Sequence, residues 1–133
     1  MARRAVRAEA RARYYIRTQA AKRGWNTTHV AKGGDFLEEN EIVDHFPAIG
    51  LGLERPDFLI CKNGEPSAVV EAKNELSKLD QAIAEACDYA DTINAAGKHQ
   101  VKIAIGAAGE EDLGFVVEVR YFSGGVWQPL LSK

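Results

Sequence analysis

Short apolar runs separated by polar, glycine-containing turns predict an α/β fold for this chain. Two runs with strand character, 56–62 and 67–73, flank the segment 62–66, whose composition is typical of a hairpin turn. In chain order the pattern predicts a helix at 4–23, strands at 25–30, 56–62 and 67–73, a helix at 78–96, and strands at 101–105, 115–122 and 126–127. No element is predicted for most of the polar, glycine-dotted segment 31–54. This order indicates a mixed central sheet flanked by helices.

Helix-ending residues support both predicted helices. Gly24 follows the first, which is rich in alanine and arginine, and Gly97 follows the second. Ser77 or Asp80 is expected to cap the start of the second helix. The Ser123-Gly124-Gly125 segment is expected to turn the chain before a last short strand.

The second helix carries an apolar stripe with a polar line beside it. The predicted core stripe consists of Leu79, Ile83, Ala86, Ala90 and Ile93. Gln81, Glu85 and Tyr89 follow at every fourth position next to this stripe, and Tyr89 lies nearest to it on the helical wheel. These three side chains are therefore candidates for supporting a site on the sheet below.

Acidic and basic residues occur where the two central strands are predicted to meet. A hairpin would bring Asp57, at the start of one strand, near Glu71, at the end of the next. Because strand side chains alternate between faces, Glu71 and Lys73 point the same way and Ala72 points into the core. A Glu-x-Lys sequence alone is usually a pair of solvated charges. Combined with Asp57, it can hold a hard divalent cation beside an ammonium that stabilises developing anionic charge.

The net charge of −2 hides an asymmetric distribution. Residues 1–23 carry eight Lys/Arg and one acid, Glu9, whereas the rest carries nine basic and eighteen acidic residues. Arg4, Arg7 and Arg11 share one side of the first helix and form a candidate basic stripe for DNA phosphates. Glu9 lies on the core-facing line, where an unpaired carboxylate is costly. An arginine-rich start also suits organelle import, but this stretch has no serine and continues into the fold.

The composition is that of one globular domain. The 133 residues are 46% hydrophobic and 27% charged, and no apolar run approaches the roughly 20 residues that span a bilayer. No secretory signal is recognisable, and we expect a cytoplasmic protein with no membrane partner. Cys61 and Cys87 fit no metal or redox spacing and are expected to be reduced and buried.

Several motifs together resemble the PD-(D/E)XK nuclease superfamily. The resemblance is strongest to the N-terminal nuclease domain of type I restriction enzyme motor subunits and of related nuclease–methyltransferase fusions. Its motifs are Glu9-Ala-Arg with Tyr15-Ile16 and Gly24-Trp25, Glu54-Arg-Pro-Asp-Phe-Leu-Ile, Asn63-Gly-Glu-Pro-Ser-Ala-Val-Val-Glu-Ala-Lys73, and Gln81-Ala with Glu85-Ala and Tyr89-Ala90. The tail, from Lys102-Ile-Ala-Ile-Gly to Gly114-Phe-Val-Val, is similar to the fusion proteins in particular. The resemblance implies a restriction endonuclease-like core.

The resemblance also implies a role for each matching residue. Asp57 and Glu71 would ligate Mg²⁺, for which Mn²⁺ would substitute, together with the backbone oxygen of Ala72. Glu9 matches an acidic residue that the superfamily often carries on its first helix, and it is a candidate further ligand. Lys73 would position the attacking water or stabilise the phosphate.

The helix motif departs from the family pattern. Gln81 and Tyr89 resemble the glutamine and tyrosine of RecB-type nucleases, where Gln81 would belong to the catalytic set. The tyrosine usually follows the glutamine by four positions, whereas here Glu85 occupies that place and Tyr89 comes one turn later. Glu85 is therefore expected to share in the supporting role.

The implied activity is Mg²⁺-dependent endonucleolytic hydrolysis of double-stranded DNA in a prokaryotic cytoplasm. Residues 1–133 would form a single nuclease domain, either part of a larger restriction–modification protein or a small stand-alone relative. Motor, methyltransferase or specificity modules in the same chain or complex are the expected partners. Two alternatives stay open: a catalytically silent scaffold or DNA-binding module, and a repair nuclease of the RecB or Holliday-junction resolvase type.

Overall fold

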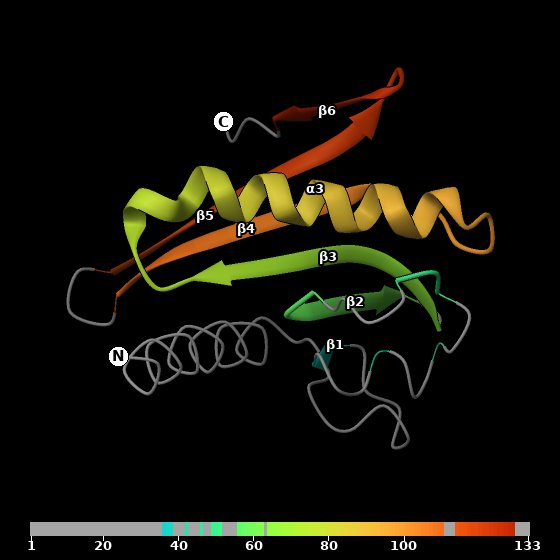
Figure 1. The fold of residues 1–133 in the computed structure, drawn as a ribbon, viewed down its shortest axis with the longest axis horizontal. Coiled ribbons are helices and arrows are strands. Elements are labelled where there is room, and N and C mark those ends of the chain that lie inside the picture. The colour runs from blue at the N-terminus through green and yellow to red at the C-terminus, as the bar shows by residue number, and fades with distance from the viewer. Residues whose placement is uncertain are drawn as a thin grey trace.

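The computed structural model describes residues 36–38, 42, 46, 49–51, 56–62, 64–110 and 114–129. Its elements are β1 (Phe36–Glu38), β2 (Phe58–Lys62), β3 (Glu65–Lys73), the 3₁₀ turn η2 (Leu76–Lys78), α3 (Leu79–Ala95), β4 (Ile103–Glu110), β5 (Gly114–Ser123) and β6 (Val126–Pro129), shown in Figure 1. The predicted helix at 4–23 and strand at 25–30 lie outside the described residues. None of the helices among the described residues is long and apolar enough to cross a membrane.

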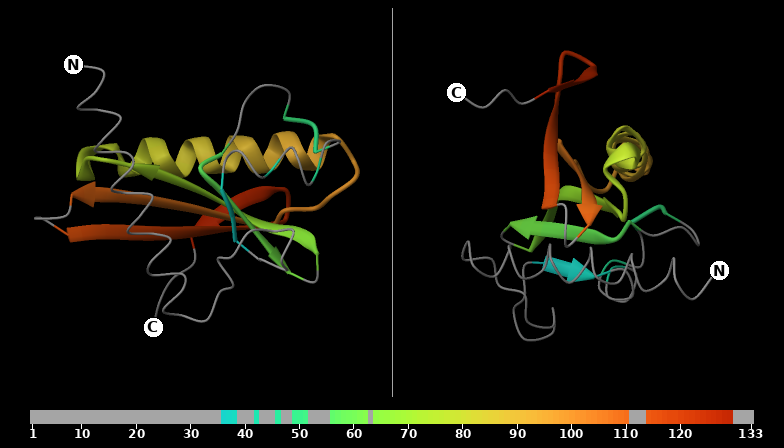
Figure 2. Two further views of the ribbon diagram at one scale, coloured as in Figure 1. Left: turned by 90° about the horizontal axis from the view of Figure 1, so that it is seen from below. Right: turned by 90° about the vertical axis from the view of Figure 1, so that its left-hand side faces the viewer.

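The six strands form one mixed sheet in which the order along the chain is also the order in space, β1 to β6. Every neighbouring pair is antiparallel except β3 and β4, which run parallel. A parallel pair needs a crossover connection, and α3 supplies it. Figure 2 (right) shows that the sheet bends strongly, so that β5 and β6 turn out of the plane of β2 and β3, with α3 on the inner side of the bend. The mixed α/β sheet predicted from the sequence is confirmed.

The sheet is apolar on both faces. The face toward α3 includes Leu59, Val69 and Ala104, which pack with Ala86, Ala90 and Ile93 of the helix. The opposite face includes Phe36, Phe58, Ile60, Ala68, Val70 and Ala72. Alternation along β3 therefore puts Val69 and Glu71 on the α3 side and Ala72 in the other core cluster, as the pattern predicts.

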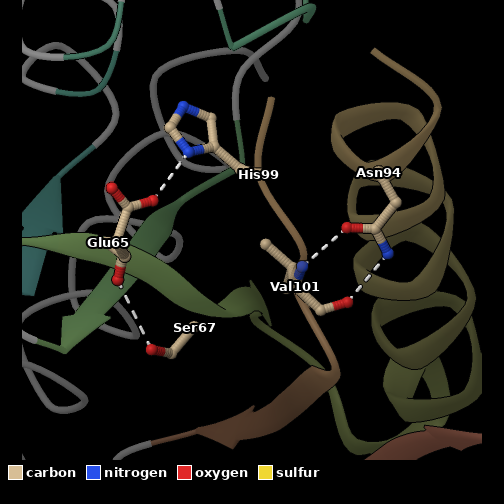
Figure 3. Close-up of polar contacts among 5 residues, drawn as sticks. All are labelled: Glu65, Ser67, Asn94, His99 and Val101. Atoms are coloured by element: carbon tan, nitrogen blue, oxygen red, sulfur yellow. Dashed lines mark hydrogen bonds and ion pairs between the residues drawn. The ribbon is translucent and has the colours of Figure 1, made fainter. Parts of the chain in front are cut away.

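Strand β4 is longer than predicted and begins later. A strand is confirmed here, but the predicted start at Val101 was wrong: the side chain of Asn94 bonds both backbone groups of Val101, which lies before the strand (Figure 3). The strand then continues through Gly106 to Gly109, a glycine–alanine segment with low strand propensity. Burial of Ala107 and Ala108 in the sheet outweighs that propensity.

The N-terminus of α3 also differs from the prediction. Neither Ser77 nor Asp80 caps the helix: Lys78 is the N-cap residue and its side chain makes no cap hydrogen bond. The 3₁₀ turn η2 runs directly into α3, and the Ser77 hydroxyl donates instead to Glu75 Oε2 at 3.4 Å. Leu79, the first residue of the predicted core stripe, is only half-buried. Ala82, which was not predicted to belong to the stripe, is buried.

The predicted turns are confirmed, and one strand was missed. Gly97 directly after α3 has φ +83°, and Gly124 and Gly125 have φ +63° and +81° between β5 and β6. β1 lies where no strand was predicted, because its three residues are too few to show a pattern and are defined as a strand by their pairing with Phe58, Leu59 and Ile60 of β2.

Both cysteines are free, but only Cys61 is buried. Cys87 is half-buried, so the prediction that both are buried was wrong for that residue. Cys87 lies on α3 one position beyond Ala86 and therefore on the edge of the buried stripe.

Candidate active site

The carboxylates of Asp57 and Glu71 are held together by reciprocal backbone hydrogen bonds. Asp57 lies just before β2, and the antiparallel register that pairs Phe58 with Val70 brings it opposite Glu71. The backbone N–H of Asp57 donates to Glu71 Oε1 at 2.9 Å. In return, the backbone N–H of Ala72 donates to Asp57 Oδ2 at 2.8 Å. Each carboxylate is thus fixed by the strand that carries the other.

Both carboxylates are withdrawn from water, with exposed fractions of 8% for Asp57 and 6% for Glu71. Burial, together with the nearby charges of Asp57 and Glu85, raises the pKa of Glu71 to about 8. The hydrogen bond from Asp57 and the charge of Lys73 act in the opposite direction. The site therefore favours a bound proton, or another cation, over two bare negative charges.

Lys73 lies at the end of β3, two positions beyond Glu71, and helix α3 supplies a partner for its ammonium. The Lys73 ammonium is 2.6 Å from Glu85 Oε2, and 16% of the Lys73 side chain is exposed. Glu85 Oε2 is shielded from water, and its contact with Lys73 is an ion pair. We attribute the contact to charge attraction because the separation is well within that of an ion pair. The charge of the ammonium also acts on Glu71, whose pKa it lowers.

The polar line on α3 enters the site only in part. Gln81 is exposed, Glu85 is half-buried and bonded to Lys73, and Tyr89 is half-buried and packs on the core cluster below α3. This gradient follows the predicted wheel, on which Tyr89 is nearest the core. The structure provides no contact between Gln81 and the carboxylates, so its predicted catalytic role stays a prediction.

The pairing of Glu85 with Lys73 is the feature that sequence reasoning missed. Glu85 was expected to share the supporting role of Gln81, but the residue that it pairs with was not predicted. The available signal was position: Glu85 lies on the flank of α3, beside buried Ala82 and Ala86, and must meet a neighbouring strand. Glu9, Arg4, Arg7 and Arg11 lie outside the described residues, and their roles stay predictions.

The donor set suits a magnesium ion better than a soft or transition metal. Among the residues that the structure describes, no cluster of three or more Asp, Glu, His or Cys side chains could enclose a metal. Mg²⁺ needs no such cage, because it is usually bound by one or two carboxylates and keeps several waters. Two buried carboxylates, one with a raised pKa, form a site whose excess negative charge a divalent cation would offset.

A mixed sheet with two facing carboxylates and a lysine, just before β2 and at the end of β3, is consistent with a restriction endonuclease-like α/β protein. Residues 4–108 match the family described as type I restriction enzyme R protein N terminus, and the chain belongs to that family. The match covers all four residues of the site, Asp57, Glu71, Lys73 and Glu85. No curated protein and no solved structure matches the chain. Family membership makes the chain a nuclease-like region of a restriction enzyme.

Proposed function

We propose that this protein is a Mg²⁺-dependent endonuclease that hydrolyses phosphodiester bonds of double-stranded DNA within a restriction–modification system. The observation that carries the proposal is the pair of backbone hydrogen bonds that holds the Asp57 and Glu71 carboxylates together. Lys73 lies two positions beyond Glu71 on the same strand. Structural ion pairs are normally of opposite charge. Two buried carboxylates fixed against each other cost stability, and a cation-dependent function explains that cost.

The residues divide the chemistry among them. Asp57 and Glu71 would hold the metal. The backbone carbonyl of Ala72, next to Glu71 on β3, would supply a third oxygen ligand. A bound Mg²⁺ would polarise the phosphate and lower the pKa of a water that attacks phosphorus. Lys73, two positions beyond Glu71 on the same strand, would stabilise the negative charge that grows on the phosphate oxygens. Glu85 would keep the Lys73 ammonium oriented until the phosphate enters.

The first test is metal-dependent cleavage by the 133-residue protein. Supercoiled plasmid is incubated with Mg²⁺, Mn²⁺, Ca²⁺ or EDTA, and nicked and linear products are measured. We expect cleavage with Mg²⁺ and Mn²⁺ and none with EDTA. Binding of DNA without cleavage under any of these conditions would favour the silent scaffold instead. Parallel assays on linear duplex and branched DNA separate a restriction nuclease from an exonuclease or a junction resolvase.

Replacement of the catalytic lysine tests the assignment of the site. Lys73→Ala is expected to lower cleavage by on the order of 10²–10³-fold, as removal of one charge-stabilising group does elsewhere. The variant should keep its circular dichroism spectrum, because Lys73 is at the end of β3 and partly exposed. Lys102→Ala is the matched control, since Lys102 is exposed and precedes the opposite end of the neighbouring strand. Cleavage by Lys73→Ala at the parental rate would contradict the assignment.

A further inference from the structure

Helix α3 approaches the sheet very closely at Gly106 of β4. A Cβ atom added to Gly106 would lie 2.5 Å from Ile83 Cγ1, 2.8 Å from the Ile83 backbone nitrogen and 3.0 Å from its Cα. The side chain of Ile83 could rotate away, but its backbone could not. The φ angle of Gly106 is not positive, so glycine is needed here for space and not for backbone conformation.

This close approach occurs beside the candidate active site. In the parallel register of β3 and β4, Gly106 is the partner of Glu71. Ala104 faces the same side of β4, and the helix presents buried alanines 82, 86 and 90. With small residues on both surfaces, the helix backbone can lie directly over β4 at the level of Glu71.

The position of α3 over β4 determines whether Glu85 reaches Lys73. Ile83 covers β4, whereas Glu85 leaves the flank of the helix toward β3 and meets Lys73 at 2.6 Å. A side chain at position 106 would lift the first turns of α3 away from the sheet. Lifting the helix would draw the Glu85 carboxylate away from the Lys73 ammonium.

We propose that Gly106 is a positioning residue of the active site, which acts by letting α3 bring Glu85 into contact with Lys73. The effect on cleavage rests on the proposed nuclease function. The effect on the Lys73–Glu85 contact does not, so the two can be tested separately.

The structural arm measures the reactivity of Lys73 toward an amine-reactive acylating reagent by peptide mass spectrometry. We expect Gly106→Ala and Glu85→Gln to raise the labelling rate of Lys73 to a similar extent, because the first moves the Glu85 carboxylate away from the ammonium and the second removes its charge. Labelling of exposed Lys102 should not change in either variant. An unchanged Lys73 rate in folded Gly106→Ala would overturn the proposal. This arm gives an answer even if the parent protein cleaves no DNA, a result that would reject the proposed function alone.

The kinetic arm is a double-mutant cycle on DNA cleavage. Gly106→Ala is expected to lower kcat by on the order of 10–100-fold, the range seen when a catalytic group is displaced by about 1 Å. DNA affinity measured in Ca²⁺ should stay the same. If Gly106 acts through Glu85, the Gly106→Ala/Glu85→Gln double variant should be no slower than the slower single variant. Independent, multiplicative losses would overturn the proposal.

Two further variants separate positioning from general instability. Gly64→Ala is a matched control, because Gly64 has φ +78° in the turn at the far end of β3, with no atom within 4 Å of an added Cβ. It should lower the melting temperature without changing kcat or Lys73 labelling. If Gly106→Ala fails to fold, Glu85→Asp replaces it: the shorter side chain withdraws the carboxylate while α3 stays in place. Parental Lys73 labelling in Glu85→Asp would then refute the proposal.

Discussion

Glu71 is a carboxylate in surroundings that disfavour its charge. Burial and the neighbouring Asp57 raise its pKa to about 8, even though Asp57 N–H donates to it and Lys73 lies nearby. Near neutral pH, the metal-free protein therefore retains a proton on Glu71 for much of the time. In the proposed function, a metal ion would have to displace that proton before both carboxylates could serve as ligands.

Magnesium affinity should therefore depend on pH. Between about pH 6 and 8 we expect the affinity for Mg²⁺ to rise as Glu71 loses its proton, and to level off above that range. Isothermal titration calorimetry in buffers of different ionisation enthalpy would also show release of up to one proton per ion. Glu71→Gln should abolish both the binding and the proton release. A pH-independent affinity would contradict the raised pKa.

At the scale of elements, the junction between α3 and β4 is fixed by one side chain. Asn94 Nδ2 donates to the Val101 carbonyl at 2.8 Å, and the Val101 N–H donates to Asn94 Oδ1 at 2.6 Å (Figure 3). Val101 is fully buried, so its backbone groups cannot turn to water. The crossover therefore leaves the helix, turns at Gly97 and enters β4 without unpaired backbone at Val101.

Loss of this contact should destabilise the protein without touching the site. Asn94→Ala is expected to lower the free energy of unfolding by about 1–3 kcal/mol, the usual cost of leaving buried polar groups unpaired. Urea unfolding followed by circular dichroism measures the change. Ser67→Ala is the control: its hydroxyl makes only a 3.4 Å bond to the Glu65 carbonyl near the surface, and its removal should change little. Equal stability of Asn94→Ala and the parent would show that the bidentate contact contributes nothing.

At the scale of the whole molecule, the raised pKa of Glu71 links folding to pH. The unfolded chain would lose this proton near pH 4.5, whereas the folded protein keeps it to about pH 8. The folded state thus binds more protons between these values, and stability falls as pH rises through them. Any ligand that binds the folded state alone opposes this loss.

Thermal unfolding in EDTA and in Mg²⁺ would reveal this linkage. In EDTA, we expect the contribution of Glu71 to lower the melting temperature between pH 5 and 8. Excess Mg²⁺ should raise the melting temperature most at pH 8, where proton competition is weakest. Glu71→Gln carries no titrating group and should lose the Mg²⁺ effect together with that part of the pH dependence. A Mg²⁺ effect that is largest at pH 5 would contradict the argument.

DNA affinity belongs to the same scale, because it depends on the distribution of charge. Beyond residue 23 the chain carries nine basic and eighteen acidic residues, so binding is expected to rely on the basic start. Replacement of Arg4, Arg7 and Arg11 by Gln should weaken binding to all sequences alike and reduce its salt dependence. Fluorescence anisotropy at several salt concentrations tests this, with Lys98→Gln/Lys102→Gln as the control. An unchanged salt slope in the arginine variant would remove that surface from the DNA interface.

The sequence alone determined the hairpin and the identity of the central residues. Asn63-Gly64 and strand alternation predict that Asp57 meets Glu71 and that Lys73 shares its face, because both rules act over a few neighbouring residues. Helix α3 was predictable for a similar reason, since its apolar stripe repeats with helical period. The motifs also indicated the family that the comparison shows.

The tertiary structure decided the distances between elements. Glu85 pairs with Lys73, and Gly106 lies under Ile83, because α3 crosses back over β4 at a height set by the side chains between them. The extension of β4 depends on burial, and the exclusion of Val101 from the strand depends on its hydrogen bonds with Asn94. Neither can be predicted from the local propensity of the sequence. Local periodicity fixes which side of an element faces inward, whereas contacts between distant segments appear only when the chain packs.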